Sequence, residues 1–418
     1  MQIPLIIRNF HAWGEAVPRD LAVVDGRFAR VEAGMIAGRT IDAGGRLAVA
    51  GLIDPHIHLD KALILDTVRP NVSGTLAEAI EIIWERKRVY SVAEIAERAG
   101  RVIEAAIGNG VTHMRSHVDV DNIGGLRPLQ GVDLARRRYA NLIDLQIVAF
   151  PQEGILKNEG TEALMWAAME AGADVVGGMP FNERTPADSA RHIEIAFQIA
   201  RRFDADIDMH VDETDDPNAR TLEVLARQTI ANGWQDRVTA SHTCALAGYP
   251  EDYAQTVMDL AAQARLHMIT NPATNLMLQG RLDAQPKRRG ITRVRELMDH
   301  GLNVSFGQDY VRDTFYPFGR NDMMEIAFLV AHAAHFSLPA EIEAVFAMPT
   351  RNAAQLMRIA DYGLQPGDRA DMVIFDAASA VDAIRFQAPR RWVVKNGRVL
   401  AESNVQRVMA LDPKPIPA

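Results

Sequence analysis

Residues 47–58 read LAVAGLIDPHIH, and the fold follows from this stretch. An apolar run from Leu47 to Ile53 is followed at once by His56 and His58. A short apolar run of this kind is typical of a strand that is buried in a parallel sheet. Because side chains two apart on a strand point to the same face, both imidazoles can face one metal ion. The spacing alone also fits chance, with both rings hydrogen-bonded at the end of a strand.

Seven further short apolar runs follow, most of them after a Gly, Asp or Asn signal. They are Val111 to Ser116, Ile143 to Phe150, Asp174 to Met179, Asp206 to His210, Arg237 to Ser241, Leu266 to Thr270 and Leu302 to Phe306. Helical patterns separate them, such as Ser91 to Ile107, which opens with the capping pair Ser91 and Glu94. Eight such repeats predict an α/β fold, a (β/α)8 TIM-type barrel with its active site at the carboxyl ends of the strands.

The two ends of the chain carry strand patterns without long helices. Asp25-Gly26 and Asn396-Gly397 each lie between two β-favouring runs. Such pairs favour two-residue hairpin turns because they tolerate positive φ at both central positions. We therefore expect a small β-sandwich domain formed by residues 1–53 and 362–418, which encloses a catalytic barrel domain of residues 54–361.

Composition places the chain among globular proteins. Hydrophobic residues make up 48% and charged residues 24%, which excludes a disordered or disulfide-stapled chain. A net charge of −9 opposes binding to nucleic acid. One cysteine fits a reducing compartment, and no apolar run approaches the roughly 20 residues that a spanning helix needs. We expect a cytoplasmic homo-oligomer with no nucleic-acid or membrane partner.

Three more side chains that can bind a metal stand at predicted strand ends. His210 ends the fifth run, His242 follows the sixth and Asp309 follows the eighth. In a closed barrel these positions meet His56 and His58 at one rim. Nitrogen and oxygen ligands with one open position are what a catalytic divalent metal requires. Buried, hydrogen-bonded histidines would produce the same pattern.

Glu213 lies three residues after His210, close enough to the rim to move protons beside a metal-bound water. The alternative is a solvated loop carboxylate, because Asp212, Asp215 and Asp216 belong to the same acidic run. The sequence alone does not single out Glu213 within this run.

The order of these residues resembles the amidohydrolase superfamily, whose barrel carries a small β-sandwich made from both chain ends. The resemblance covers essentially the whole chain. Within the superfamily, several segments are similar to bacterial cytosine deaminases. These segments are Phe150 to Gly154, His210 to Glu213, Thr239 to Thr243, Leu278 to Arg281 and Pro286 to Val294.

The resemblance implies a role for each candidate residue. The metal ligands would be His56, His58, His210 and Asp309. Glu213 would shuttle protons, His242 would hydrogen-bond the water on the metal, and Asp309 would relay a proton to the leaving group. Gln152 would read a ring carbonyl and its neighbouring nitrogen through its amide. We expect one divalent metal per chain, Fe(II) or Zn(II), because the fourth strand (175–180) lacks the lysine that bridges two metals in related enzymes.

Two positions depart from the cytosine deaminases, Tyr310 replacing a second aspartate and Phe315 a tryptophan. The face that binds the substrate has therefore changed. We expect a small-molecule heterocyclic substrate and an aminohydrolase that releases ammonia from a cytosine-like ring, such as a 5-substituted cytosine, isocytosine or a creatinine-like ring. The alternatives are removal of an alkylamine from an s-triazine ring and a catalytically silent scaffold on the same fold.

Four other residues near the rim receive simpler interpretations. Lys61 is expected to pair with Asp60, and Cys244 to be a buried small hydrophobic residue. His113 is expected in the core. His117 either contacts the metal ligands or only packs the mouth of the barrel.

Overall fold

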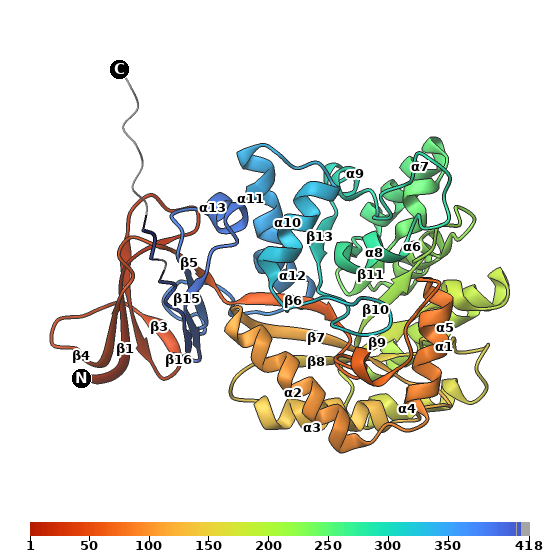
Figure 1. The fold of residues 1–418 in the computed structure, drawn as a ribbon, viewed down its shortest axis with the longest axis horizontal. Helices are drawn as coiled ribbons and strands as arrows, with labels where there is room; N and C mark the ends of the chain where they lie inside the picture. Colours follow the sequence, from red (N-terminus) through yellow and green to blue (C-terminus); the bar gives the residue numbers. More distant parts are fainter. Residues whose placement is uncertain (407, 411–418) are drawn as a thin grey trace.

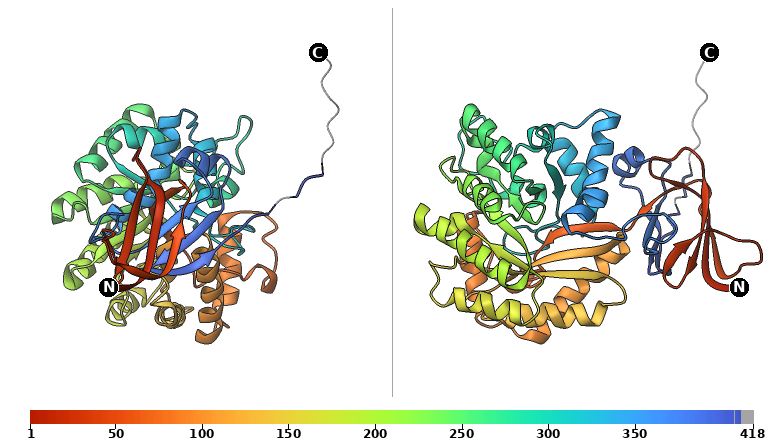
Figure 2. Two further views of the ribbon diagram at one scale, coloured as in Figure 1. Left: turned by 90° about the vertical axis from the view of Figure 1, so that its left-hand side faces the viewer. Right: turned by 180° about the vertical axis from the view of Figure 1, so that it is seen from behind.

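A computed structural model of the chain describes residues 1–406 and 408–410. It has two parts (Figure 1), a sheet formed by both ends of the chain and a larger barrel surrounded by helices. Figure 2 shows from behind that the strands of the two chain ends lie together beside one end of the barrel. The predicted α/β class, with a barrel and a separate β domain from the termini, is confirmed.

The barrel consists of eight parallel strands in chain order. They are β6 (Leu52–Ile57), β7 (Val111–Asp119), β8 (Asp144–Phe150), β9 (Val175–Gly178), β10 (Asp206–Val211), β11 (Val238–His242), β12 (His267–Thr270) and β13 (Asn303–Phe306). The Asp309 N–H donates to the His56 carbonyl (2.8 Å), and the His58 N–H donates to the Asp309 carbonyl (3.0 Å). These two bonds close the ring and bring three predicted site residues side by side.

Helices cover the outside of the barrel (Figure 1). They are α1 (Leu76–Lys87), α2 (Val92–Gly108), α3 (Arg127–Tyr139), α4 (Thr161–Glu170), α5 (Pro186–Phe203), α6 (Thr221–Asn232), α7 (Glu251–Gln263), α8 (Pro272–Leu278), α9 (Val294–Asp299), α10 (Met323–Ala333), α11 (Pro339–Ala347) and α12 (Ala353–Leu356). Helix α13 (Ala380–Arg385) lies between two strands of the terminal part and packs on α10 and α11. Helix α2 begins as predicted, because the Ser91 side chain accepts from the Glu94 N–H. Within the described residues, no helix combines the length and apolar character needed to cross a bilayer.

The terminal sheet contains the other eight strands. They are β1 (Gln2–Ala12), β2 (Arg19–Val24), β3 (Arg27–Ala29), β4 (Ile36–Asp42), β5 (Leu47–Ala50), β14 (Met372–Phe375), β15 (Arg390–Lys395) and β16 (Arg398–Glu402). Their order is β16-β15-β14-β5-β1-β2-β3, with β4 paired to β1. Both predicted hairpin turns are present, with positive φ throughout Asp25-Gly26 and Asn396-Gly397. Phe10, Phe28 and Trp392 belong to one core that joins the two halves of this sheet.

The prediction of Leu47 to Ile53 as a single strand is wrong. The structure divides this run at Gly51, so that β5 pairs with β14 in the terminal sheet and β6 pairs with β7 in the barrel. A Cβ at Gly51 would lie 2.0 Å from the Thr112 hydroxyl, which leaves room only for glycine. The sequence could not reveal the division because the residues of the run on both sides of Gly51, Leu47–Ala50 and Leu52–Ile53, are apolar and buried.

Lys395 ties the terminal sheet to the barrel. Its buried ammonium donates to Asp144 Oδ2 at the start of β8 (2.6 Å) and to Asp371 Oδ2 beside β14 (2.7 Å). His113, which is buried as predicted, places its Nε2 3.1 Å from the same Asp144 oxygen. These contacts hold the amino-terminal end of the barrel against the β domain, away from the predicted site.

Candidate active site

The four predicted metal ligands converge at the carboxyl end of the barrel. His56 and His58 come from β6 and its end, His210 from β10, and Asp309 from the segment after β13. The Nε2 atoms of His58 and His210 are 3.1 Å apart, and Asp309 Oδ1 lies 3.4 Å from His56 Nε2 and 3.5 Å from His58 Nε2. One ligand atom from each residue lies within 4.8 Å of the others, and all four side chains are buried.

The chemistry of this donor set fits a divalent cation. Burial lowers the pKa of His56, His58 and His210, so these imidazoles are neutral and offer lone pairs. Among the described residues, His56 Nε2 and both carboxylate oxygens of Asp309 have no hydrogen-bond partner. Buried polar atoms without partners are costly, and a metal ion among them would remove that cost. The set matches a mixed imidazole and carboxylate site for zinc or iron(II).

His117 contacts the ligands, which decides between its two predicted roles. Its backbone carbonyl lies 3.1 Å from His58 Nδ1, where a neutral ring must donate a proton to bond it. Its ring packs on that of His56, with centroids 4.1 Å apart. His117 therefore helps to orient two ligands and leaves the Nε2 lone pair of His58 for the metal.

Glu213 lies in direct contact with His242. Its Oε1 is 3.2 Å from His242 Nδ1 and accepts from Asn275 Nδ2 at 3.2 Å. Burial, followed by the nearby carboxylate of Asp309, raises the pKa of Glu213 well above its ordinary value. Burial also lowers the pKa of His242 to about 3, so its ring is neutral. A carboxyl whose pKa is raised by burial, beside a neutral imidazole, is suited to proton transfer.

The structure distinguishes Glu213 from Asp212, its neighbour in the acidic run. Asp212 Oδ1 accepts from the backbone N–H and the hydroxyl of Thr221 (3.0 and 2.6 Å). Its Oδ2 accepts from the Leu222 N–H (3.0 Å) and from the Tyr249 hydroxyl (3.1 Å). Asp212 thus caps the start of α6, which leaves Glu213 as the carboxyl beside the ligand set.

Two asparagines complete the surroundings of His242. Asn271 Nδ2 lies 3.1 Å from His242 Nε2, and Asn275 Nδ2 lies 3.1 Å from His242 Nδ1. Sequence patterns did not indicate either residue. Asn271 directly follows β12, the seventh barrel strand, so its place at a strand end was the available signal. Asn275 lies one turn into α8, and no local pattern marks it.

The prediction that Lys61 pairs with Asp60 is wrong. The Lys61 ammonium donates to Asp119 Oδ1 (2.5 Å) and to Gln152 Oε1 (2.6 Å), and all three side chains are buried. Since an ammonium only donates, it fixes the Gln152 amide with its oxygen toward Lys61 and its NH2 group away from it. Lys87 continues this buried network with bonds to Asp121 (2.6 Å) and to Glu153 (2.9 Å).

Tyr310 and Phe315 form an aromatic wall beside the ligands. The Tyr310 ring is stacked on His58, with centroids 4.5 Å apart and an interplanar angle of 7°. The Phe315 ring is stacked on the Tyr310 ring, with centroids 4.3 Å apart. The Lys61 ammonium lies 6.0 Å from the Tyr310 ring and 5.9 Å from the Phe315 ring. Both aromatic rings are no more than 3% exposed, so the site is enclosed.

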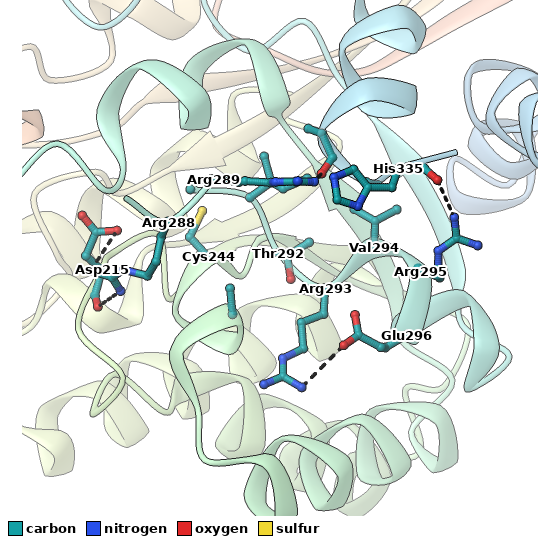
Figure 3. Close-up of a pocket in the computed structure, with 15 residues that line it drawn as sticks. Asp215, Cys244, Arg288, Arg289, Thr292, Arg293, Val294, Arg295, Glu296 and His335 are labelled. Atoms are coloured by element: carbon teal, nitrogen blue, oxygen red, sulfur yellow. Dashed lines mark hydrogen bonds and ion pairs between the residues drawn. The ribbon is translucent and has the colours of Figure 1, made fainter. Parts of the chain in front are cut away.

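A separate cavity of about 460 Å³ is lined mainly by residues 288–296 (Figure 3). Its floor includes the buried Cys244, and none of its fifteen lining residues is a predicted site residue. Its guanidinium groups already have partners: Arg288 bonds Asp283, and Arg293 bonds Glu251. Burial raises the pKa of Cys244, which fits the predicted role of an unreactive thiol.

The chain is similar in sequence and in fold to known enzymes. The sequence profile of the amidohydrolase family matches residues 89–401. The structure of 5-methylcytosine deaminase from Klebsiella pneumoniae superposes with a TM-score of 0.93 and 36% identity, over 97% of this chain and 99% of that one. N-isopropylammelide isopropylaminohydrolase from Burkholderia multivorans gives a TM-score of 0.84 and 30% identity, over 96% and 98% of the two chains. The N-isopropylammelide isopropyl amidohydrolase of Pseudomonas sp. (strain ADP) is 29% identical over 413 residues, 96% of this chain and 98% of that one.

Proposed function

The chain belongs to the amidohydrolase family and is a hydrolase of C–N bonds, and from this premise we propose that it deaminates a small amino-substituted pyrimidine, with a 5-substituted cytosine as the first candidate. The observation that carries the proposal is the contact of Glu213 with His242 beside the convergent ligand set. A silent scaffold would have no need to keep a carboxyl of raised pKa buried beside such a set.

The four ligands His56, His58, His210 and Asp309 would hold one divalent metal, zinc or iron(II). When bound, such a metal lowers the pKa of a water ligand enough for the water to lose a proton near neutral pH. Glu213, whose pKa is raised by burial, would give a proton to a ring nitrogen of the substrate. Asp309 can pass a further proton to the departing amine. In the overall reaction, water replaces the amino group on the ring carbon, and the products are a ring carbonyl and ammonia.

Substrate recognition would fall to Gln152, Tyr310 and Phe315. Because Lys61 occupies the Gln152 amide oxygen, the NH2 group is the part that can donate to a ring carbonyl. Tyr310 offers one hydroxyl where related enzymes offer a charged acceptor, and Phe315 is smaller than tryptophan. We propose that this wall accepts a ring with an added substituent. Support comes from the Klebsiella pneumoniae relative, a 5-methylcytosine deaminase that was solved with 5-fluorocytosine.

Removal of an alkylamine from an s-triazine ring is the second candidate. Two relatives near 30% identity carry that activity in their names, and both align along nearly the whole chain. The chemistry at the attacked carbon is the same, and only the leaving group differs. The released amine therefore distinguishes the two functions.

The test measures the amine released from a panel of rings by protein of known metal content. The panel holds cytosine, 5-methylcytosine, isocytosine, creatinine and N-isopropylammelide. We expect ammonia, with 5-methylcytosine preferred to cytosine in kcat/KM. Release of isopropylamine as the fastest reaction would favour the second candidate. Cytosine faster than every analogue by a hundredfold would show that the altered wall does not redirect specificity.

The variant Tyr310→Asp tests the wall directly. A site that hydrogen-bonds a polar ring edge discriminates strongly against a ring that lacks it, by about 10⁴–10⁵ in favourable cases. Restoring a carboxylate should therefore raise the kcat/KM for cytosine relative to the preferred substrate. An unchanged ratio would mean that Tyr310 does not face the ring.

A further inference from the structure

A buried chain of hydrogen bonds runs inside the barrel and ends at His56. His56 Nε2 faces the ligand set, and its other ring nitrogen, Nδ1, lies 3.1 Å from the Ser241 hydroxyl. Ser241 Oγ donates to Asp208 Oδ1 (3.1 Å), and Arg115 Nη1 donates to Asp208 Oδ2 (2.9 Å). The four residues come from four different strands, β6, β11, β10 and β7, and all are buried.

The donors and acceptors of this chain decide which nitrogen of His56 carries the proton. Arginine only donates, and a carboxylate paired with it only accepts. A serine hydroxyl has one proton, and Asp208 takes it. Ser241 can then only accept from His56, so Nδ1 must carry the ring proton. The lone pair of Nε2 is left pointing at the ligand set.

We propose that Ser241 and Asp208 are positioning residues that hold His56 as its Nδ1–H tautomer and so set the affinity of the site for a divalent metal. This inference rests on the proposed metal-dependent function, and it concerns two residues outside the ligand set. Hydrogen-bond partners of metal-binding histidines typically contribute 10–100-fold to metal affinity. The ring of His117 packs on the ring of His56. The orientation of His56 is therefore fixed both by this packing and by the chain of hydrogen bonds through Ser241.

The first test replaces Ser241 by alanine and measures zinc affinity by competition with a chromogenic chelator. The change leaves His56 Nδ1–H without its acceptor, and we expect zinc to bind 10–100-fold more weakly. Ser305→Ala is the matched control, because Ser305 is equally buried in barrel strand β13, which is separated from β11 by β12. Its hydroxyl donates to the Met348 carbonyl (2.6 Å), away from the ligand set, so its zinc affinity should stay within twofold of the parent.

The second test replaces Asp208 by asparagine, which has nearly the same shape. Arg115 would donate to the amide oxygen of the asparagine, and the NH2 group of the asparagine would then face Ser241. Ser241 would accept from this group and turn its own proton toward His56. His56 would then be protonated on Nε2 and unable to bind a metal, so the zinc affinity should fall at least as far as in Ser241→Ala. Thermal melting of the metal-free proteins shows that each variant is folded.

The outcomes separate this inference from the proposed function. Equal zinc affinities for Ser241→Ala and Ser305→Ala would overturn it, whatever Asp208→Asn does. A parent protein that binds no zinc or iron(II) would overturn both proposals. If the parent binds zinc but releases no ammonia from any ring, the deaminase proposal fails. A 10–100-fold difference in zinc affinity between the two serine variants would still support the positioning role of Ser241.

Discussion

Replacing Lys61 by methionine should reduce catalysis much more than it reduces stability. Lys61 fixes the amide of Gln152, and methionine keeps the length of the side chain while removing its charge and its three donors. The amide would then be held only by the long bond from its Nε2 to Glu153 Oε1 (3.4 Å), so its NH2 group would be presented to a ring carbonyl less reliably. Asp119, the other partner of Lys61, would keep a counter-ion, because Lys87 lies 2.9 Å from Asp119 Oδ2.

The magnitude follows from the bond that is lost. A hydrogen bond to a charged group contributes about 1.5–3 kcal/mol. If the whole of that contribution orients Gln152 for the substrate, kcat/KM falls by roughly 10–150-fold, since each 1.36 kcal/mol is a factor of ten. The loss should appear for substrates that carry the ring carbonyl and be smaller for analogues that lack it.

Lys87→Met is the matched control, because Lys87 is equally buried in the same network. Its loss leaves Asp121 and Glu153 without their cation, which should lower the free energy of unfolding by about 3–5 kcal/mol. The kcat/KM of its folded fraction should change by less than about threefold. The assay combines ammonia release with urea unfolding of both variants. Equal losses of kcat/KM in the two variants would refute a specific role for Lys61 in orienting Gln152.

Three further predictions concern the proton shuttle, the metal and the domain junction. Glu213→Gln should keep the metal content but lower ammonia release by roughly 10²–10⁴; release at the parent rate would remove Glu213 from the mechanism. Elemental analysis should give one metal per parent chain and far less in Asp309→Ala, whereas two equivalents in active parent protein would contradict the single site. Lys395→Met should lower the free energy of unfolding in urea by about 3 kcal/mol, since buried Asp371 loses its cation; parent-like unfolding would show that the junction does not depend on this ion pair.

Local patterns were enough to predict the architecture. Apolar runs and capping signals predicted the eight barrel strands and α2, because the residues that form each element are neighbours in sequence. The two hairpin turns were equally local. The division at Gly51 could not be predicted, because both sides of the glycine are apolar and only the folded chain assigns them to different sheets.

Of the candidate site, only the residues that stand at strand ends could be predicted from the sequence. His56, His210 and Asp309 stand at the ends of strands, and barrel closure alone brings them together. The partners of Lys61 and the choice between Glu213 and Asp212 depend on residues from other elements. Asp212 caps a helix that starts nine residues later, and Lys61 meets a carboxylate of the next strand. No spacing in the sequence encodes such contacts.

Charge balance within the enclosed site gives a physical reason for a single metal. The histidine ligands are neutral, so one divalent ion would be balanced by Asp309 and by Glu213 when it has given up its proton. The neighbouring carboxylate of Asp119 is already engaged by Lys61 and Lys87. A second divalent ion beside the first would therefore have to share His56, His210 or Glu213 with it. Burying an uncompensated charge costs several kcal/mol, which disfavours a second ion beside the first.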